Sequence, residues 1–493
     1  MSISATHTTR AGPLRAPLAL WVGAAVYAMF VLAGNHLLID PDTMWQVTVG
    51  RWILDHGAVP TADVYSFTMR GQPWISTQWL AQVAYAGAYA LAGWAGPVVL
   101  ASICIAATFA LFARYLAQRL SESTTLVLVA AALALTVPHL LARPHVLAFP
   151  VMIAWVGGLV TAADRGGAPP FRLLPLMVLW ANLHGGFVLG LALVLPIAAD
   201  AVCNAESSQR RPLTLRWAAF ALAALAAGCI TPYGWHSLLA SRKILGLGEA
   251  LQLITEWRPA DFSYPGSLEI CLLLGFGLAL YRGISLPPMR IVLLLGMLHL
   301  ALSQARSVEI LALLAPLFLA APLARQIGAA DPDARPRLSP PLAAAMGATL
   351  LAGTIAWAPL ARFEPHRTGS PVAAVAELKK RDLSRVFNDY DFGGYLIESG
   401  VAPFIDGRTE LYGEKFFVDH HAARSLKKPD ELFRLLDEYR IEATLLRTET
   451  AAAALLDHID GWQKIYSDDI ATIHLRRPGA VHSVEPAVSP QAK

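Results

Sequence analysis

The first two thirds of the chain consist of long apolar blocks separated by short polar segments. The first block, residues 17–34, reads "PLALWVGAAVYAMFVLAG" almost without interruption. The further blocks lie near residues 97–117, 123–140, 145–163, 173–184, 186–203, 216–231, 266–281, 290–303, 307–322 and 341–360. Because about 20 helical residues cross the hydrocarbon core of a bilayer, this pattern predicts a polytopic α-helical membrane protein with about eleven spans.

The pattern changes after residue 365, where the long apolar blocks stop. Short segments then alternate in character: "SRVFND", "APFID", "IEATLLRT" and "IATIHLRR" predict strands, whereas "GYLIESG" and "PDELFRLLDEYR" predict helices. We therefore expect a membrane domain over residues 17–361 and a small mixed α/β domain over residues 370–478. A tail at 1–16 and a disordered tail at 479–493 flank them.

Composition and charge agree with a membrane protein. Hydrophobic residues make up 55% of the chain and charged residues 15%, against roughly 25% charged residues in ordinary soluble domains. The four cysteines have no close spacing, so they indicate neither a disulfide framework nor a cysteine metal cluster. The formal charge of +3 says little, because the distribution of charge matters more than its sum. No nucleic-acid partner is expected.

Arginine is unevenly distributed between alternate connecting segments. It is more frequent on the side of the N-terminal tail, where Arg114, Arg165 and Arg172 also fall. Since cytoplasmic loops carry the excess of positive charge, we expect a cytoplasmic N-terminus. An odd number of spans then places the C-terminal domain outside the cytoplasm.

The first outer loop, residues 35–78, is longer than a simple connection requires, which is typical of a functional loop. It contains "IDPDTMWQVTVGRWILD". Trp45, Val49 and Trp52 share one face of a predicted helix, which suits the membrane interface.

The aspartates that open this loop, Asp40 and Asp42, allow two interpretations. Asp40 before Pro41 fits a helix N-terminus, and Thr43 with Gln46 fits a capping box. Alternatively, two exposed carboxylates at a membrane surface can perform chemistry. Both interpretations stay open at the level of sequence.

These motifs resemble the GT-C superfamily of membrane glycosyltransferases, and most closely the bacterial proteins labelled as family-39-like, which are similar to protein mannosyltransferases. The resemblance covers nearly the whole chain. Its motifs are Asp40-x-Asp42, "GRWIL" at 50–54, Pro73-Trp74 with Trp79-Leu80, "WANLHGG", and "GGYL…FIDGR" at 393–408. The chain departs from the family in having Thr77-Gln78 and Gln46 where relatives often carry His-Glu and His.

The resemblance implies transfer of a sugar from a polyprenyl-phosphate carrier to a glycan, lipid or protein acceptor. The reaction would be inverting and would take place on the outer face of the bacterial cytoplasmic membrane, in cell-envelope polysaccharide biosynthesis. Asp42 is the first candidate for the catalytic base and Asp40 the second. Either could instead bind a divalent cation, Mg²⁺ or Mn²⁺.

A departing carrier phosphate needs cations, and guanidinium groups supply them well. The candidates on the outer side are Arg143, Arg258 and Arg306; for Arg306, a simple intrahelical pair with Glu309 stays an alternative.

Other polar residues form an acceptor or secondary site: Glu256, Asp261, Asp63, His184, Asp406 and Arg408. Plainer structural roles stay open for several of them. Glu256 and Asp261 could lie on a solvated loop. His184 could make a structural hydrogen bond at a helix break, and Asp406 with Gly407 could simply form a turn.

Two other functional classes stay open beside the enzyme. The first is a non-catalytic assembly or carrier-lipid-binding protein of surface-polysaccharide biogenesis that keeps the same scaffold. The second is a transporter, which would show broken helices at matching positions in two halves. Only one such interruption, "NLHGG", is visible in the sequence.

Overall fold

A computed structural model describes residues 17–328 and 339–477. The predicted tails, 1–16 and 479–493, lie outside the described residues. The chain forms two compact units, called here the helical unit and the α/β unit. The helical unit takes residues up to 37, 92–231 and 259–363, and the α/β unit takes residues 38–91, 232–258 and those from 364 onward.

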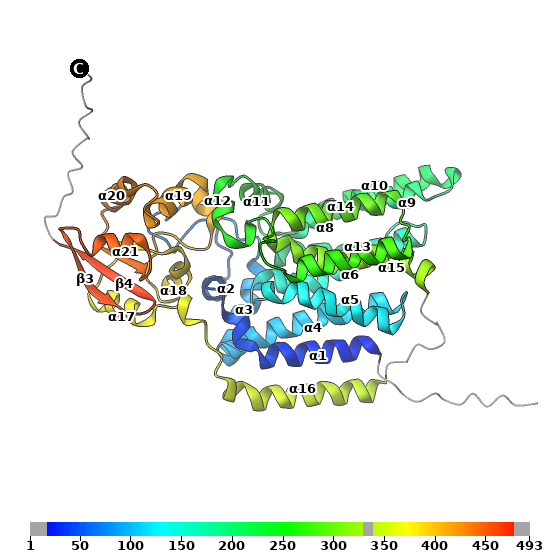
Figure 1. Cartoon of the computed structure of the whole chain (residues 1–493), viewed down its shortest axis with the longest axis horizontal. Helices are drawn as coiled ribbons and strands as arrows, with labels where there is room; N and C mark the ends of the chain where they lie inside the picture. Colours follow the sequence, from blue (N-terminus) through cyan, green and yellow to red (C-terminus); the bar gives the residue numbers. More distant parts are fainter. Residues whose placement is uncertain (1–16, 329–338, 478–493) are drawn as a thin grey trace, which may run out of the picture. The chain divides into compact units, whose positions relative to one another are not determined.

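The helical unit is built from helices that run side by side (Figure 1). They are α1 (Leu18–Leu32), α4 (Ala95–Ala117), α5 (Glu122–Thr136), α6 (Pro144–Asp164), α7 (Leu174–Leu183), α8 (Phe187–Ala192), α9 (Val194–Cys203), α10 (Ser207–Gly228), α13 (Ser267–Arg282), α14 (Pro288–Ser303), α15 (Val308–Ile327) and α16 (Pro340–Ala361). The short 3₁₀ turns η2 (Val137–His139), η3 (Phe171–Leu173) and η5 (Ala305–Ser307) join some of them. Each predicted apolar block overlaps one or more of these helices.

Five helical segments among the described residues are long and apolar enough to cross a membrane: Ala95–Ala117, Glu122–His139, Pro144–Asp164, Ala305–Ile327 and Pro340–Ala361. Four shorter apolar segments accompany them, at Leu18–Leu32, Phe171–Leu183, Phe187–Cys203 and Pro288–Ser303. These helices agree with the predicted membrane class, and the count of about eleven spans stays a prediction.

Buried charges within the helical unit compensate one another. Arg290 is buried, and its Nε donates to Asp200 Oδ2 at 3.0 Å. It also donates to Asp164 Oδ1 and, at 2.8 Å, to the carbonyl of Phe318. Ionised groups are tolerated among spans when they face the protein interior and pair there, so this cluster fits a membrane bundle.

The α/β unit combines helices with one sheet. Its helices are α2 (Asp42–His56), α3 (Trp79–Ala92), α11 (His236–Leu245), α12 (Glu249–Leu253), α17 (Val372–Lys380), α18 (Gly393–Glu398), α19 (Thr409–Arg424), α20 (Pro429–Glu438) and α21 (Ala451–Leu456). Its 3₁₀ turns are η4 (Thr255–Trp257), η6 (Arg367–Gly369) and η7 (Tyr390–Phe392), and η1 (Gly34–Leu38) lies at the unit boundary. The unit is larger than residues 370–478, because the first outer loop also belongs to it.

The sheet has four strands in the order β1-β2-β4-β3. They are β1 (Val386–Asn388), β2 (Ala443–Arg447), β3 (Trp462–Ser467) and β4 (Ala471–Arg476). β1 pairs with β2 in parallel, and the other pairs are antiparallel. The predictions of β1, β2, β4, α18 and α20 are confirmed.

The predicted strand at "APFID" is wrong: only Pro403 bridges Val386, and no ladder forms. The side chain of Asn388 takes the place of a ladder there. Its Oδ1 accepts the N–H of Phe404 at 2.7 Å, and its Nδ2 donates to the Ile405 carbonyl at 2.8 Å. This clamp holds the start of the "IDGR" segment beside the end of β1.

Candidate functional site

The two aspartates at the start of α2 make different contacts. Asp40 Oδ1 accepts the backbone N–H of Asp42 at 2.7 Å, which is the kind of contact that a capping residue makes. Asp42 Oδ1 instead accepts the indole N–H of Trp45 at 2.9 Å. Both aspartates are partly exposed. The carboxylate of Asp42 is thus held by a side chain one helical turn away.

Gln46 does not serve the predicted capping box. It is buried, and its Oε1 accepts from Gln82 Nε2 at 2.8 Å. Gln82 Oε1 in turn accepts from Ser76 Oγ at 2.8 Å. Gln46 is therefore a buried amide that ties α2 to α3.

Glycine 407 touches the carboxylate of Asp42. A Cβ atom added there would lie 2.0 Å from Asp42 Oδ1 and 3.0 Å from Trp45 Nε1. Gly394 makes a similarly close approach, since its Cβ would lie 2.3 Å from the carbonyl oxygen of Pro41. The motif "GGYL…FIDGR" thus packs its backbone directly on the "DPD" loop, and it can do so only because these residues lack side chains.

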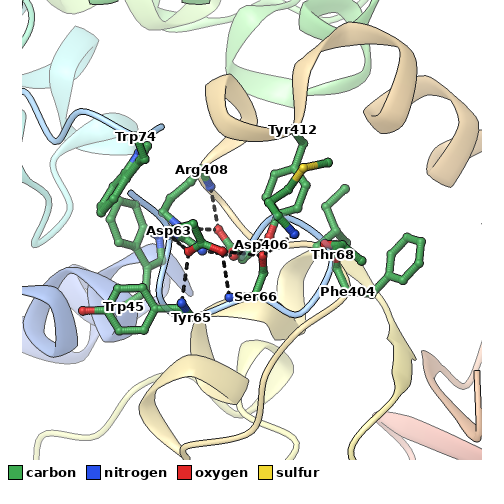
Figure 2. Close-up of polar contacts among 12 residues, drawn as sticks. Trp45, Asp63, Tyr65, Ser66, Thr68, Trp74, Phe404, Asp406, Arg408 and Tyr412 are labelled. Atoms are coloured by element: carbon green, nitrogen blue, oxygen red, sulfur yellow. Dashed lines mark hydrogen bonds and ion pairs between the residues drawn. The ribbon is translucent and has the colours of Figure 1, made fainter. Parts of the chain in front are cut away.

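Arg408 is the centre of a buried ion network beside this contact (Figure 2). Its NH1 donates to Asp63 Oδ1 at 2.6 Å, and its NH2 donates to Asp406 Oδ2 at 2.7 Å. Tyr412 Oη donates to Asp406 Oδ2 at 2.6 Å. Asp63 also accepts from Ser66 Oγ at 2.6 Å. All three charged groups are therefore paired, as burial demands.

Burial alone would raise the pKa of Asp406. The charge of Arg408, its hydrogen bonds and the Tyr412 hydroxyl outweigh burial and hold the pKa of Asp406 below its ordinary value. The Asp406 carboxylate therefore stays ionised at neutral pH. The network joins the first outer loop, through Asp63, to the C-terminal segment, through Asp406 and Arg408.

Aromatic rings surround the network. The Arg408 guanidinium lies 4.9 Å from the ring centre of Trp74 and 5.2 Å from that of Tyr65. Trp74 packs edge-on against Trp45, with 6.3 Å between the ring centres. Its indole N–H donates to Glu410 Oε1 at 3.0 Å. Tryptophans expected at the membrane interface thus support the site.

Tyr390 lies within the electrostatic influence of both Asp42 and Glu256. Burial raises the pKa of Tyr390 well above its ordinary value, and the negative charges of Asp42 and Glu256 raise it further. Its phenol therefore stays protonated at neutral pH. Sequence reasoning missed Tyr390, because "NDYDFGG" carries no signal that its tyrosine would approach residues more than a hundred positions away.

Arg258 is the candidate phosphate ligand that belongs to this unit. Its Nε donates to the carbonyl of Gln252 at 2.9 Å. The same segment is fixed to α19, because the N–H of Glu249 donates to Glu414 Oε1 at 2.7 Å. The positive charge of Arg258 also contributes to lowering the pKa of His421, after burial, Arg424 and Lys427.

Four further candidates, Arg143, Arg306, His184 and Asp261, belong to the helical unit. Arg143 is the residue before α6, and Arg306 lies in η5. His184 follows α7, and its Nδ1 accepts the N–H of Gly186 at 3.1 Å. Its ring lies 6.1 Å from that of His145.

Asp261 is an exposed loop residue whose Oδ1 accepts the N–H of Ser263 at 2.8 Å. The backbone and side-chain hydrogen bonds from Ser263 lower the pKa of Asp261.

A divalent cation at Asp40 and Asp42 needs further ligands. Across the residues that the structure describes, no group of three or more His, Cys, Asp or Glu side chains is arranged to hold a metal ion. The two aspartates alone do not complete such a set. The cation therefore stays a prediction from the sequence resemblance.

The helical unit has helices long and apolar enough to cross a membrane, and comparison with solved structures identifies the fold. The chain is similar to the crystal structure of the Archaeoglobus fulgidus oligosaccharyltransferase in the apo form. The TM-score is 0.55 at 12% sequence identity, over 94% of this chain and 74% of that chain. At this identity the likeness concerns the fold, and the GT-C fold is confirmed.

A second similar structure is the archaeal oligosaccharyltransferase from Archaeoglobus fulgidus with an inhibitory peptide and a dolichol-phosphate. It gives a TM-score of 0.49 at 11% identity and the same coverage. No family model matches the chain, and no curated protein matches it.

Replacing Asp63 with Asn should destabilise the protein, because Arg408 would keep its buried charge with one carboxylate fewer. Breaking a buried ion pair typically costs about 3–5 kcal/mol. We expect a lower melting temperature for full-length Asp63→Asn in thermal unfolding of the detergent-solubilised protein. Asp55→Asn, on the exposed end of α2, is the matched control and should melt like the wild type. Equal melting of both variants would contradict the proposed importance of the network.

Gly407→Ala should displace the Asp42 carboxylate, because the added methyl group cannot fit 2.0 Å from Oδ1. If the transfer of sugar proposed in the next subsection takes place at Asp42, its rate, measured as release of polyprenyl phosphate, should fall at least about tenfold, because small misplacements of reacting groups can reduce rates by 10²-fold. Gly87→Ala in α3 is the control, since a Cβ there meets nothing within 4 Å. Wild-type activity in folded Gly407→Ala would show that this contact does not shape the site.

Proposed function

We propose that this protein is a glycosyltransferase that takes a sugar from a polyprenyl-phosphate carrier and transfers it, with inversion, to a glycan, lipid or protein acceptor. The reaction would take place on the outer face of the bacterial cytoplasmic membrane. One observation carries the proposal: on a GT-C fold, the Asp42 carboxylate is held between the Trp45 indole and the Gly407 backbone. Mere capping of α2 does not require that enclosure.

Asp42 is the proposed general base. It accepts the proton of the acceptor while the acceptor oxygen or nitrogen attacks the anomeric carbon and the carrier phosphate departs. The hydrogen bond from Trp45 fixes the orientation of the carboxylate before the acceptor arrives. Asp40, which accepts an amide of α2, supports this position.

The leaving group is a phosphate anion, so it needs cationic stabilisation and no added proton. Arg258 shares a unit with Asp42, whereas Arg143 and Arg306 belong to the helical unit. We propose that at least one of these three arginines binds the carrier phosphate. Glu256, near Tyr390, is the proposed acceptor-side carboxylate.

Asp42→Asn tests the base directly. Asn preserves the shape and can still accept the Trp45 hydrogen bond, but it cannot take up a proton. General-base catalysis contributes about 10²–10⁴-fold, so transfer should fall by that factor. The measurement is release of polyprenyl phosphate in membranes that contain the native polyprenyl-phosphate sugars, followed by mass spectrometry.

Two further variants accompany this measurement. Asp40→Asn should reduce transfer by a similar or smaller factor, and Asp55→Asn should leave it unchanged. Full activity in both Asp40→Asn and Asp42→Asn would return these residues to the capping interpretation. If the wild-type protein binds the carrier lipid but transfers no sugar, the non-catalytic carrier-binding alternative is favoured.

Arg143→Gln, Arg258→Gln and Arg306→Gln test the phosphate contact. Loss of a charge-assisted hydrogen bond should weaken binding of polyprenyl phosphate by about tenfold for at least one of them. Binding is measured by titration of the full-length protein. Arg70→Gln, an exposed position in the first outer loop, is the charge-matched control. Unchanged binding in all three variants would exclude this set of ligands.

A further inference from the structure

A cavity of about 480 Å³ lies in the helical unit, separate from all the candidate residues above. It is bounded by the C-terminal halves of α4 and α6 and by the connection from α6 to α7. Arg114 of α4, Arg165 directly after α6 and Arg172 in the connection to α7 all line it. Such convergence of guanidinium groups indicates an anionic ligand.

The three arginines are available to a ligand. Each side chain is exposed, and none forms an ion pair with another residue that the structure describes. Nearby Arg119 differs, because its NH2 donates to Thr161 Oγ1 at 2.9 Å and its Nε lies 3.7 Å from Asp164 Oδ2. The neighbouring acidic residue Asp164 is paired with Arg119 and Arg290.

Apart from Gln118 and Thr161, the remainder of the cavity wall is mainly apolar. Leu111, Ile153 and Ala154 line it together with Leu173. Close packing fixes this wall, since a Cβ on Gly158 would lie 2.8 Å from Leu173 Cδ1 and one on Gly157 would lie 3.1 Å from the Tyr115 ring. A ligand for this cavity therefore combines an anionic group with an apolar chain.

The position of the cavity indicates where that ligand comes from. It lies at the Asp164 end of α6, whereas Arg143 precedes the other end. At 1.5 Å per residue, a helix of 21 residues is about 31 Å long, close to the thickness of the hydrocarbon core. The arginine-lined end of the cavity therefore lies at the level of the lipid headgroups, where basic pockets between spans bind anionic lipids.

We propose that this cavity binds an anionic glycerophospholipid of the surrounding membrane. Its phosphate would contact Arg114, Arg165 and Arg172, and one acyl chain would lie along the apolar wall. This site is distinct from the proposed transferase site and does not depend on it. The lipid would link α4, α6 and the start of α7 at their shared end.

The test is native mass spectrometry of the full-length, detergent-solubilised protein titrated with phosphatidylglycerol or phosphatidylcholine. We expect at least a tenfold preference for phosphatidylglycerol. Each of Arg114→Gln, Arg165→Gln and Arg172→Gln should weaken phosphatidylglycerol binding about fivefold, and the triple variant about 100-fold. Arg282→Gln, an exposed arginine at the end of α13 that does not line the cavity, should change nothing.

Two further measurements keep the outcome decisive. Ala154→Phe fills the apolar wall without removing charge and should also weaken lipid binding, whereas inorganic phosphate alone should not compete. Equal binding of both phospholipids, or unchanged binding in all the arginine variants, would overturn the proposal. Stronger binding of polyprenyl phosphate than of phosphatidylglycerol would also overturn it and assign the cavity to the carrier lipid.

Discussion

The buried pairing of Arg408 with Asp63 and Asp406 is the interaction on which the α/β unit depends. These residues come from segments more than 300 positions apart, and all three are almost inaccessible to solvent. Bringing a guanidinium and two carboxylates out of water is favourable only when each finds its partners there. The first outer loop and the C-terminal segment can therefore reach this low-energy state only together.

This pairing also explains the shape of the candidate site. Once Arg408 and Asp406 are fixed, Gly407 between them lies against the Asp42 carboxylate. The neighbouring residues are fixed by the same region: Trp74 contacts Arg408, Trp45 and Glu410. The position of Asp42 thus depends on the segment that this residue pair fixes. Such support from surrounding groups is what a reacting carboxylate needs in order to stay in one orientation.

Sequence patterns were sufficient for the parts of the fold that depend on local periodicity. The apolar blocks coincide with helices, and the segments at "SRVFND", "IEATLLRT" and "IATIHLRR" form strands. The strand prediction at "APFID" was wrong for a physical reason. The side chain of Asn388 makes hydrogen bonds in place of a strand ladder, and the alternation of apolar and polar residues does not reveal such bonds. β3 was not predicted, because most of its side chains are exposed or half-buried and its sequence shows little alternation of apolar and polar residues.

Most of the charged residues of the candidate site were predictable from the sequence, whereas Tyr390 and the contacts between the residues were not. Asp63, Asp406 and Arg408 were singled out as separate polar residues, yet no local signal pairs a loop aspartate with an arginine 345 positions later. The resemblance to a known family singled out both motifs of the site, "DPD" and "FIDGR". Each motif contains residues whose contacts allow few substitutions, such as Gly407 against Asp42.

The structure adds the reason that these two motifs occur in one chain. The second motif needs a glycine at position 407, because its backbone there approaches the Asp42 carboxylate of the first motif. The C-terminal segment is therefore an integral wall of the candidate site, and a folded α/β unit is a precondition for any chemistry at Asp42.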